Sequence, residues 1–110
     1  MELRHLKYFV AVAEEQNITR AAARLHVSQP PLSRQIHDLE HELGVTLFER
    51  GPKAVRLTKA GKLFLPEARA VLQRADEAMR AVKNVRAQEL NVGYAPSPTL
   101  EILPAALRRF

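Results

Sequence analysis

The chain contains no cysteine among its 110 residues. This absence excludes disulfide bridges and metal sites built from thiolates, and it fits a reducing compartment. No apolar run is long enough to span a bilayer, and the opening segment Met-Glu-Leu-Arg-His lacks the pattern of a signal peptide. We therefore expect a soluble, cytoplasmic protein with no membrane partner.

Positive charge is present but not concentrated. The formal net charge is +5, which suits a polyanionic partner. Residues 1–58, however, hold eight Lys and Arg against seven Asp and Glu. Any binding of a polyanion by this part must come from the placement of individual cations rather than from bulk charge. The length allows one ordinary domain, or a small domain with an appendage.

The most informative segment, residues 18–36, has the pattern of two short helices joined by a tight turn. Thr19 is expected to cap a first helix over about residues 20–25, in which Ala22 lies where two helices cross closely. His26 occupies a turn position that favours left-handed geometry, and Ser28 is expected to cap the second helix. Such a helix-turn-helix is typical of proteins that place the second helix in the major groove of DNA.

The second helix has two contrasting faces at a period of 3.6 residues. One face is an apolar stripe that we expect to be buried: Leu32, Ile36, Leu39 and Leu43. The opposite face carries groups able to contact base edges, thymine methyls or phosphates. The DNA-binding residues predicted on this helix are Gln29, Pro30, Pro31, Ser33, Arg34 and His37.

A first helix and a hairpin are predicted to complete the domain. The helix covers about residues 3–15, and its apolar positions close a three-helix core: Leu3, Leu6, Phe9, Val10 and Ala13. Gly44 marks the end of the second helix of the motif. Residues 46–50 and 54–57 form two short extended segments, which beside a helix-turn-helix indicate a wing. Arg50 and Lys53 are predicted to place cations from this wing on phosphates or in a narrow minor groove.

A long helix is predicted from Thr58 to about Ala87. Its apolar positions recur in steps of four and three through three heptads, a spacing that favours pairing with another helix. We expect a homodimer in which this stripe faces a partner, with an intramolecular partner as the alternative. The predicted dimerisation residues are Phe64, Ala68, Val71, Leu72, Ala75, Met79 and Val82.

Taken together, residues 1–87 resemble the DNA-binding domain and linker helix of LysR-type bacterial transcriptional regulators. The resemblance is carried by five motifs: Leu3-x-x-Leu6-x-x-Phe9, Ala21-Ala22-x-x-Leu25-x-Val27-Ser28-Gln29-Pro30-Pro31-Leu32-Ser33, Ile36-x-x-Leu39-Glu40-x-x-Leu43-Gly44, Leu47-Phe48-x-Arg50 and Leu57-Thr58-x-Ala60-Gly61. It implies a mainly α fold, a winged helix-turn-helix with a three-helix core followed by a long dimerisation linker helix. It also implies homodimers or homotetramers on double-stranded promoter DNA, contact with RNA polymerase and a small-molecule inducer.

The resemblance divides the chain into three parts. Residues 1–58 correspond to the DNA-binding domain, 59–87 to the linker helix and 88–110 to the start of an effector-binding domain. In the last part, Leu90–Tyr94 resembles a first strand and Thr99–Phe110 a first helix. Because these two elements cannot build a sheet alone, we expect a truncated effector domain that does not sense its ligand.

Two alternatives remain beside DNA reading. One is a dimerisation module, built on residues 58–87, that retains the helix-turn-helix only as a fold. The other is a zinc peptidase, because His37-Asp38-Leu39-Glu40-His41 matches an H-x-x-E-H pattern with two histidines on one helical face. Leu39 belongs to the core stripe and a third ligand is missing, so we predict no catalytic residue, no metal site, no cofactor and no enzymatic activity.

Overall fold

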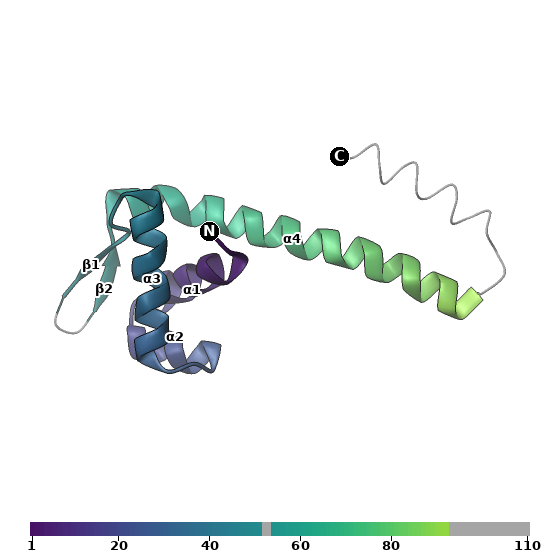
Figure 1. Ribbon diagram of the computed structural model, residues 1–110, viewed down its shortest axis with the longest axis horizontal. Helices are drawn as coiled ribbons and strands as arrows, with labels where there is room; N and C mark the ends of the chain where they lie inside the picture. Colours follow the sequence, from purple (N-terminus) through teal and green to yellow (C-terminus); the bar gives the residue numbers. More distant parts are fainter. Residues whose placement is uncertain (52–53, 93–110) are drawn as a thin grey trace. The chain divides into compact units, whose positions relative to one another are not determined.

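The computed structural model describes residues 1–51 and 54–92. Helices and one hairpin follow each other in the predicted order, and the fold is mainly α (Figure 1). The elements are α1 (Leu3–Glu15), α2 (Ile18–Leu25), α3 (Gln29–Leu43), β1 (Phe48–Arg50), β2 (Val55–Leu57) and α4 (Lys59–Val92). The chain divides into two units, Met1–Gln73 and Arg74–Phe110, so the first part of α4 belongs to the N-terminal unit.

The core of the N-terminal unit is built around Phe9 of α1, which is fully buried. Its ring lies 5.4 Å from the ring of Phe48 in β1 and 5.1 Å from that of Phe64 in α4, centroid to centroid. Such tilted aromatic pairs add to the free energy gained by burying apolar surface. One side chain therefore joins the helices, the hairpin and the beginning of α4. The rest of the buried core is Leu6, Val10, Ala11, Val12, Ala13, Ala21, Ala22, Leu32, Ile36, Leu39, Leu47, Val55 and Ala68.

The predicted core stripes are confirmed except at two helix ends. Leu3 remains 47% exposed at the start of α1, and Leu43 remains 37% exposed at the end of α3. Both positions have the correct helical spacing. Each lies in a terminal turn, where fewer neighbouring elements are available to cover a side chain.

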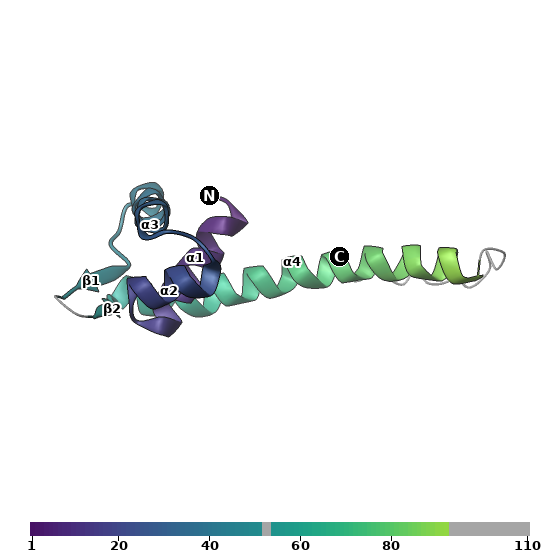
Figure 2. The ribbon, with the colours of Figure 1, turned by 90° about the horizontal axis from the view of Figure 1, so that it is seen from below.

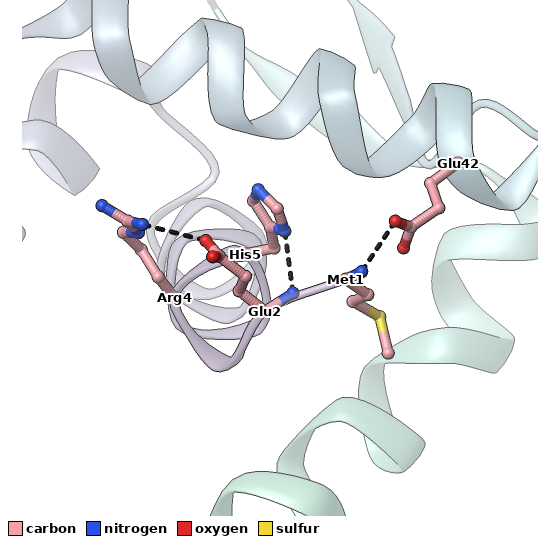
Figure 3. Close-up of polar contacts among 5 residues, drawn as sticks. All are labelled: Met1, Glu2, Arg4, His5 and Glu42. Carbon is pink, nitrogen blue, oxygen red and sulfur yellow. Dashed lines mark hydrogen bonds and ion pairs between the residues drawn. The ribbon is translucent and has the colours of Figure 1, made fainter.

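The first turn of α1 is held by polar contacts outside this core (Figure 3). His5 accepts a hydrogen bond at Nδ1 from the backbone N–H of Glu2 at 3.0 Å. The carboxylate of Glu2 pairs with Arg4 at 2.9 Å, and this contact lowers the pKa of Glu2. The amine of Met1 meets Glu42 of α3 at 2.7 Å. The start of α1 is thus tied to the C-terminal end of α3.

The hairpin is a two-stranded antiparallel sheet that lies at one edge of the helical unit, next to the start of α4 (Figures 1 and 2). Its strands are shorter than predicted because only three residue pairs are in register, from Phe48 with Leu57 to Arg50 with Val55. Glu40 connects the hairpin to α3, since its Oε2 accepts hydrogen bonds from the backbone N–H groups of Leu47 at 2.6 Å and Phe48 at 3.3 Å.

The start of α4 is fixed by Thr58 and Gly61. Thr58, where the long helix is predicted to begin, caps it, because its hydroxyl oxygen accepts a hydrogen bond from the Gly61 N–H at 3.0 Å. The same hydroxyl donates to the carbonyl of Thr46 at 2.6 Å. Gly61 packs directly against the backbone of Leu47, and a Cβ at this position would overlap the carbonyl oxygen of Leu47. Only glycine permits this close approach.

Two predicted boundaries are wrong. The first concerns α2, which begins at Ile18 and is capped by Asn17, whose Oδ1 accepts from the Arg20 N–H at 2.9 Å. Asn is at least as good an N-cap as Thr, so Thr19 lies inside the first turn instead.

The second boundary concerns α4, which runs through Leu90 to Val92, where a strand was expected. A helix satisfies its backbone hydrogen bonds within its own segment, whereas a strand needs a neighbouring strand, and residues 90–92 continue the helix. Residues 93–110, with the remainder of the predicted strand and the predicted helix 99–110, lie outside the described residues.

Candidate nucleic-acid interface

The turn between α2 and α3 has the geometry expected from the sequence. His26 adopts a left-handed conformation with φ of 59°, and its N–H is bonded to the last carbonyls of α2. Val27 donates to the Ala22 carbonyl at 3.0 Å, which closes the end of α2. Ala21 and Ala22 are buried at the contact with the neighbouring helices. Histidine thus fills a position where a left-handed residue is required.

The first turn of α3 presents an exposed polar edge. Ser28 is its N-cap by backbone geometry, although its side chain makes no capping hydrogen bond. The prolines that follow lack an N–H and therefore leave fewer unpaired donors in this turn. The structure brings five of the six predicted α3 residues to the surface, with Ser33 half-buried beside them: Gln29, Pro30, Pro31, Arg34 and His37. The buried face of the same helix is formed by Leu32, Ile36 and Leu39.

Ion pairing separates the arginines of α2, α3, the hairpin and the first part of α4 into two groups. Arg24 and Arg69 both bind the carboxylate of Glu14, at 2.8 and 2.9 Å, and Arg24 also reaches Glu15 at 3.3 Å. These guanidinium groups, Arg24 foremost, hold the pKa of Glu14 below its ordinary value. Their charge is neutralised within the protein. They are therefore poor candidates for phosphate binding.

The second group has no carboxylate partner within residues 1–51 and 54–92. It consists of Arg20, Arg34, Arg50 and Arg56, all exposed. Arg34 lies on the exposed face of α3, and Arg50 ends β1. Arg20 was not predicted, because its isolation from carboxylates is visible only in three dimensions. These cations retain their full charge for a polyanion.

The described part of the hairpin carries two exposed arginines. Arg56 lies opposite Glu49 in the register of the two strands, but the two side chains form no ion pair. Arg50 lies opposite the apolar Val55 and has no such neighbour. Of the two predicted wing residues, Arg50 is therefore exposed and available, and Lys53 lies outside the described residues.

The predicted dimerisation stripe is divided between two environments. Phe64 and Leu72 are half-buried against the core of their own chain, and Ala68 is only 1% exposed within that core. The assignment of Ala68 to a partner contact is thus corrected, since its side chain is already covered. Val71 is 45% exposed, and farther along α4 Met79 and Val82 are 55% and 71% exposed, with Ala75 intermediate.

The H-x-x-E-H pattern of α3 contributes a contact between this helix and the hairpin. Its glutamate, Glu40, uses one carboxylate oxygen to bind two backbone N–H groups of the β1 segment. His37 Nδ1 lies 3.6 Å from the other oxygen. No group of three metal-binding side chains occurs in the described part of the chain. The pattern borders an open depression of about 590 Å³ lined by His37, Glu40, His41, Gly44, Val45 and Thr46.

A family model and the sequences of known proteins both match this chain to bacterial transcriptional regulators. Residues 3–62 match the family model described as "Bacterial regulatory helix-turn-helix protein, lysR family". The chain is 51% identical over 112 residues to the Hca operon transcriptional activator HcaR of Escherichia coli, covering all of this chain and 38% of HcaR. It is 48% identical over 113 residues to the regulator TfdT of Cupriavidus pinatubonensis, covering 50% of that protein. The chain thus spans half or less of the length of these relatives.

Solved structures show the same fold. The DNA-binding domain of CbnR in complex with DNA superposes with a TM-score of 0.74 at 50% identity, covering 76% of this chain and 97% of that one. The BenM DNA-binding domain with catB site 1 DNA gives a TM-score of 0.75 at 50% identity, covering 78% and 97%. Among the described residues, no helix has the length and apolar character required to cross a membrane.

Proposed function

Because the chain belongs to the lysR family of bacterial regulatory helix-turn-helix proteins, we propose that it binds promoter DNA sequence-specifically and regulates transcription. In this proposal α3 enters the major groove and the β1–β2 wing lies at the backbone or minor groove. The observation that carries it is Arg34, which is exposed on α3 with no carboxylate partner in the described ranges. An unpaired guanidinium can bind both acceptors of a guanine edge.

The remaining contacts are proposed according to their surroundings. Gln29, Pro30, Pro31, Ser33 and His37 would meet the groove beside Arg34, and Arg50 and Lys53 would serve the wing. Arg20 is added as a phosphate contact because it is exposed and unpaired within the described part of α1 to α4. The first helix of a helix-turn-helix crosses the DNA backbone, which suits a cation on α2.

We further propose a homodimer, or a tetramer formed from such dimers, in which the exposed part of the α4 stripe faces a partner. Val71, Met79 and Val82 are apolar and exposed, and Ala75 lies between them at helical spacing. The two DNA-binding domains of the dimer would then bind the two halves of a two-fold symmetric DNA site. The division into a DNA-binding part (1–58), a linker helix (59–87) and the start of an effector domain (88–110) belongs to the same proposal.

The wider partners rest on family resemblance alone. RNA polymerase contact, a small-molecule inducer and a cytoplasmic location are proposed because regulators of this type act at promoters in response to ligands. We propose no enzymatic role. Glu40, the residue that a zinc peptidase would require as its base, supports this view because it is hydrogen-bonded to the backbone of the β1 segment.

The test is selection of sites from random DNA, followed by titration of the selected site with the Arg34→Ala variant. We expect Arg34→Ala to weaken specific binding by about 1–3 kcal/mol and to relax preference at one base pair. Arg80→Ala is a matched control, because it removes the same charge from a residue already paired with Asp76 at 2.6 Å. Absence of salt-sensitive, sequence-preferring binding by the parent chain would contradict the proposal and favour a dimerisation module.

A further inference from the structure

The side chains of Thr19 and Gln29 meet at the junction of the two helices of the helix-turn-helix. Gln29 Nε2 donates a hydrogen bond to Thr19 Oγ1 at 3.0 Å, across ten residues of sequence. Both residues are exposed, Thr19 in the first turn of α2 and Gln29 in the first turn of α3. Because both residues are exposed, this neutral hydrogen bond adds little to folding stability. Its position on the proposed reading edge therefore suggests a role in recognition.

The hydroxyl of Thr19 is available for this contact because Asn17 caps α2 in its place. Asn17 Oδ1 accepts a hydrogen bond from the Arg20 N–H at 2.9 Å. The Thr19 oxygen is then free to accept from Gln29, and its own O–H remains to donate. Since the first helix of such a motif crosses the DNA backbone, a phosphate oxygen is a suitable acceptor for that proton.

The hydrogen bond also selects which part of the Gln29 amide faces outward. A glutamine amide has two N–H donors and an acceptor oxygen. With one N–H held by Thr19, the amide still offers one donor and one acceptor. That pair complements the N7 acceptor and the N6 donor of adenine in the major groove. A glutamine without a partner would have to order its side chain and choose its amide orientation only on binding.

We propose that Thr19 is a positioning residue for Gln29: it orders the glutamine amide for base reading and connects that reading to a phosphate contact made by α2. The inference rests on the proposed DNA-binding function. Exclusion of water on binding would strengthen the Thr19–Gln29 hydrogen bond at the moment when it is needed. The effect should appear in base preference at one position, whereas a plain phosphate contact changes affinity for all sequences alike.

The test measures base preference for DNA sites selected by the parent chain, with each base pair substituted in turn. Gln29→Ala identifies the base pair that Gln29 reads. We expect Thr19→Val to reduce discrimination at that same base pair by about twofold to tenfold, which is the cost of ordering one free side chain. Thr19→Ser is the matched control that keeps the hydroxyl, and it should retain the preference. In a Gln29→Ala background, Thr19→Val should cause no further loss at this position.

Several results would overturn the inference. Equal weakening on all sequences would reduce Thr19 to a phosphate contact, and an unchanged profile would leave it without a role. Loss of preference in Thr19→Ser would show that the hydroxyl is not the determinant. Additive effects of Thr19→Val and Gln29→Ala, or no base preference dependent on Gln29, would also contradict it.

A measurement on the free protein separates this inference from the DNA-binding proposal. Side-chain amide NMR of the parent should show slower hydrogen exchange for Gln29 than for Gln73, which is also an exposed helical glutamine. Thr19→Val should remove that difference. If Gln29 and Gln73 exchange alike in the parent, the hydrogen bond does not persist in solution and the positioning role fails. Failure of the parent to bind any DNA would instead contradict the proposed function.

Discussion

The first and second parts of α4 carry the same apolar periodicity but have different surroundings. In Lys59–Gln73 most of the stripe is covered by the core of the same chain, through Phe64 and Ala68, and only its last part, at Val71, is exposed. In the part that begins at Arg74, Met79 and Val82 remain mostly exposed. A heptad pattern therefore identifies a helix face that requires a partner, but it does not say whether that partner is the same chain or another one.

The polar contacts of the two parts differ in the same way. In the first part, Thr58 caps the helix and Gly61 packs against the backbone of Leu47. Arg69 forms an ion pair with Glu14 of α1. In the second, the pair Arg80–Asp76 lies within the helix itself at a spacing of four residues. Such exposed pairs stabilise a helix only slightly. We therefore expect substitutions in the first part to change folding stability and those in the second part to change association.

Gly61→Ala should have the largest effect. In an open helix this change stabilises by about 1 kcal/mol, because alanine is the better helix former. At Gly61 the new methyl would meet the Leu47 carbonyl, so we expect a net loss of about 3 kcal/mol in the free energy of unfolding. Urea denaturation measures the change, and Ala81→Gly at an exposed site calibrates helix propensity. A stabilised Gly61→Ala variant would show that α4 does not pack closely on the Leu47 segment.

Phe64→Ala should cause the next largest loss in the free energy of unfolding. The ring contacts Phe9 and is half-buried, so we expect a loss of about 2 kcal/mol, below the 3–5 kcal/mol typical of fully buried phenylalanine. Leu63→Ala is the matched control, because the Leu63 side chain is 69% exposed. Its removal should lower the free energy of unfolding by less than about 0.5 kcal/mol. Equal losses in the two variants would contradict the assignment of Phe64 to the core of its own chain.

Met79→Ser combined with Val82→Ser tests the second part of the helix. We expect the unfolding free energy at low protein concentration to change by less than about 1 kcal/mol, because both side chains are mostly exposed. Self-association, measured by sedimentation equilibrium, should weaken by about tenfold or more if these side chains form the dimer contact. Unchanged association would place the partner surface elsewhere and would remove Met79 and Val82 from the proposed interface.

Local patterns were sufficient to predict most elements of the fold. Helix periodicity predicted α1 and the buried face of α3, and left-handed residues at His26 and Gly44 marked two helix ends as expected. The exposed edge of α3 follows from the same periodicity. These features depend on residues within a few positions of each other, which is the range over which sequence patterns carry structural information.

Features that depend on the three-dimensional geometry of the helices and their contacts were not predictable in the same way. Asn17 and Thr19 are both competent caps two residues apart, and only the helix geometry decides between them. The role of Glu40 depends on backbone N–H groups seven and eight residues away, which no motif encodes. The Thr19–Gln29 contact likewise exists only because α2 and α3 cross. The sequence thus predicted which residues of the candidate site are exposed. It did not predict the contacts that order their side chains.

The ion pairs of Glu14, which join α1 to α2 and to the first part of α4, should give the smallest effect, visible through its pH dependence. Arg24, and then Arg69, lower the pKa of Glu14 below its ordinary value of 4.5. A carboxyl whose pKa is lowered on folding stabilises the folded state above its unfolded pKa, and that contribution is lost as the pH falls through the lowered value. The side chain of Glu14 is one-third exposed, so solvent screening keeps the effect small.

Glu14→Gln isolates this contribution. The parent should have the higher thermal midpoint at pH 7, and the difference should shrink as the pH falls below about 4.5. Glu49→Gln is the matched control, since Glu49 makes no ion pair in the described part of the chain, and its offset from the parent should stay nearly constant. A Glu14→Gln midpoint that follows the parent at every pH would mean that α4 is held on α1 by apolar packing alone. The contrast between the two parts of α4 would then rest entirely on Gly61, Phe64 and Ala68.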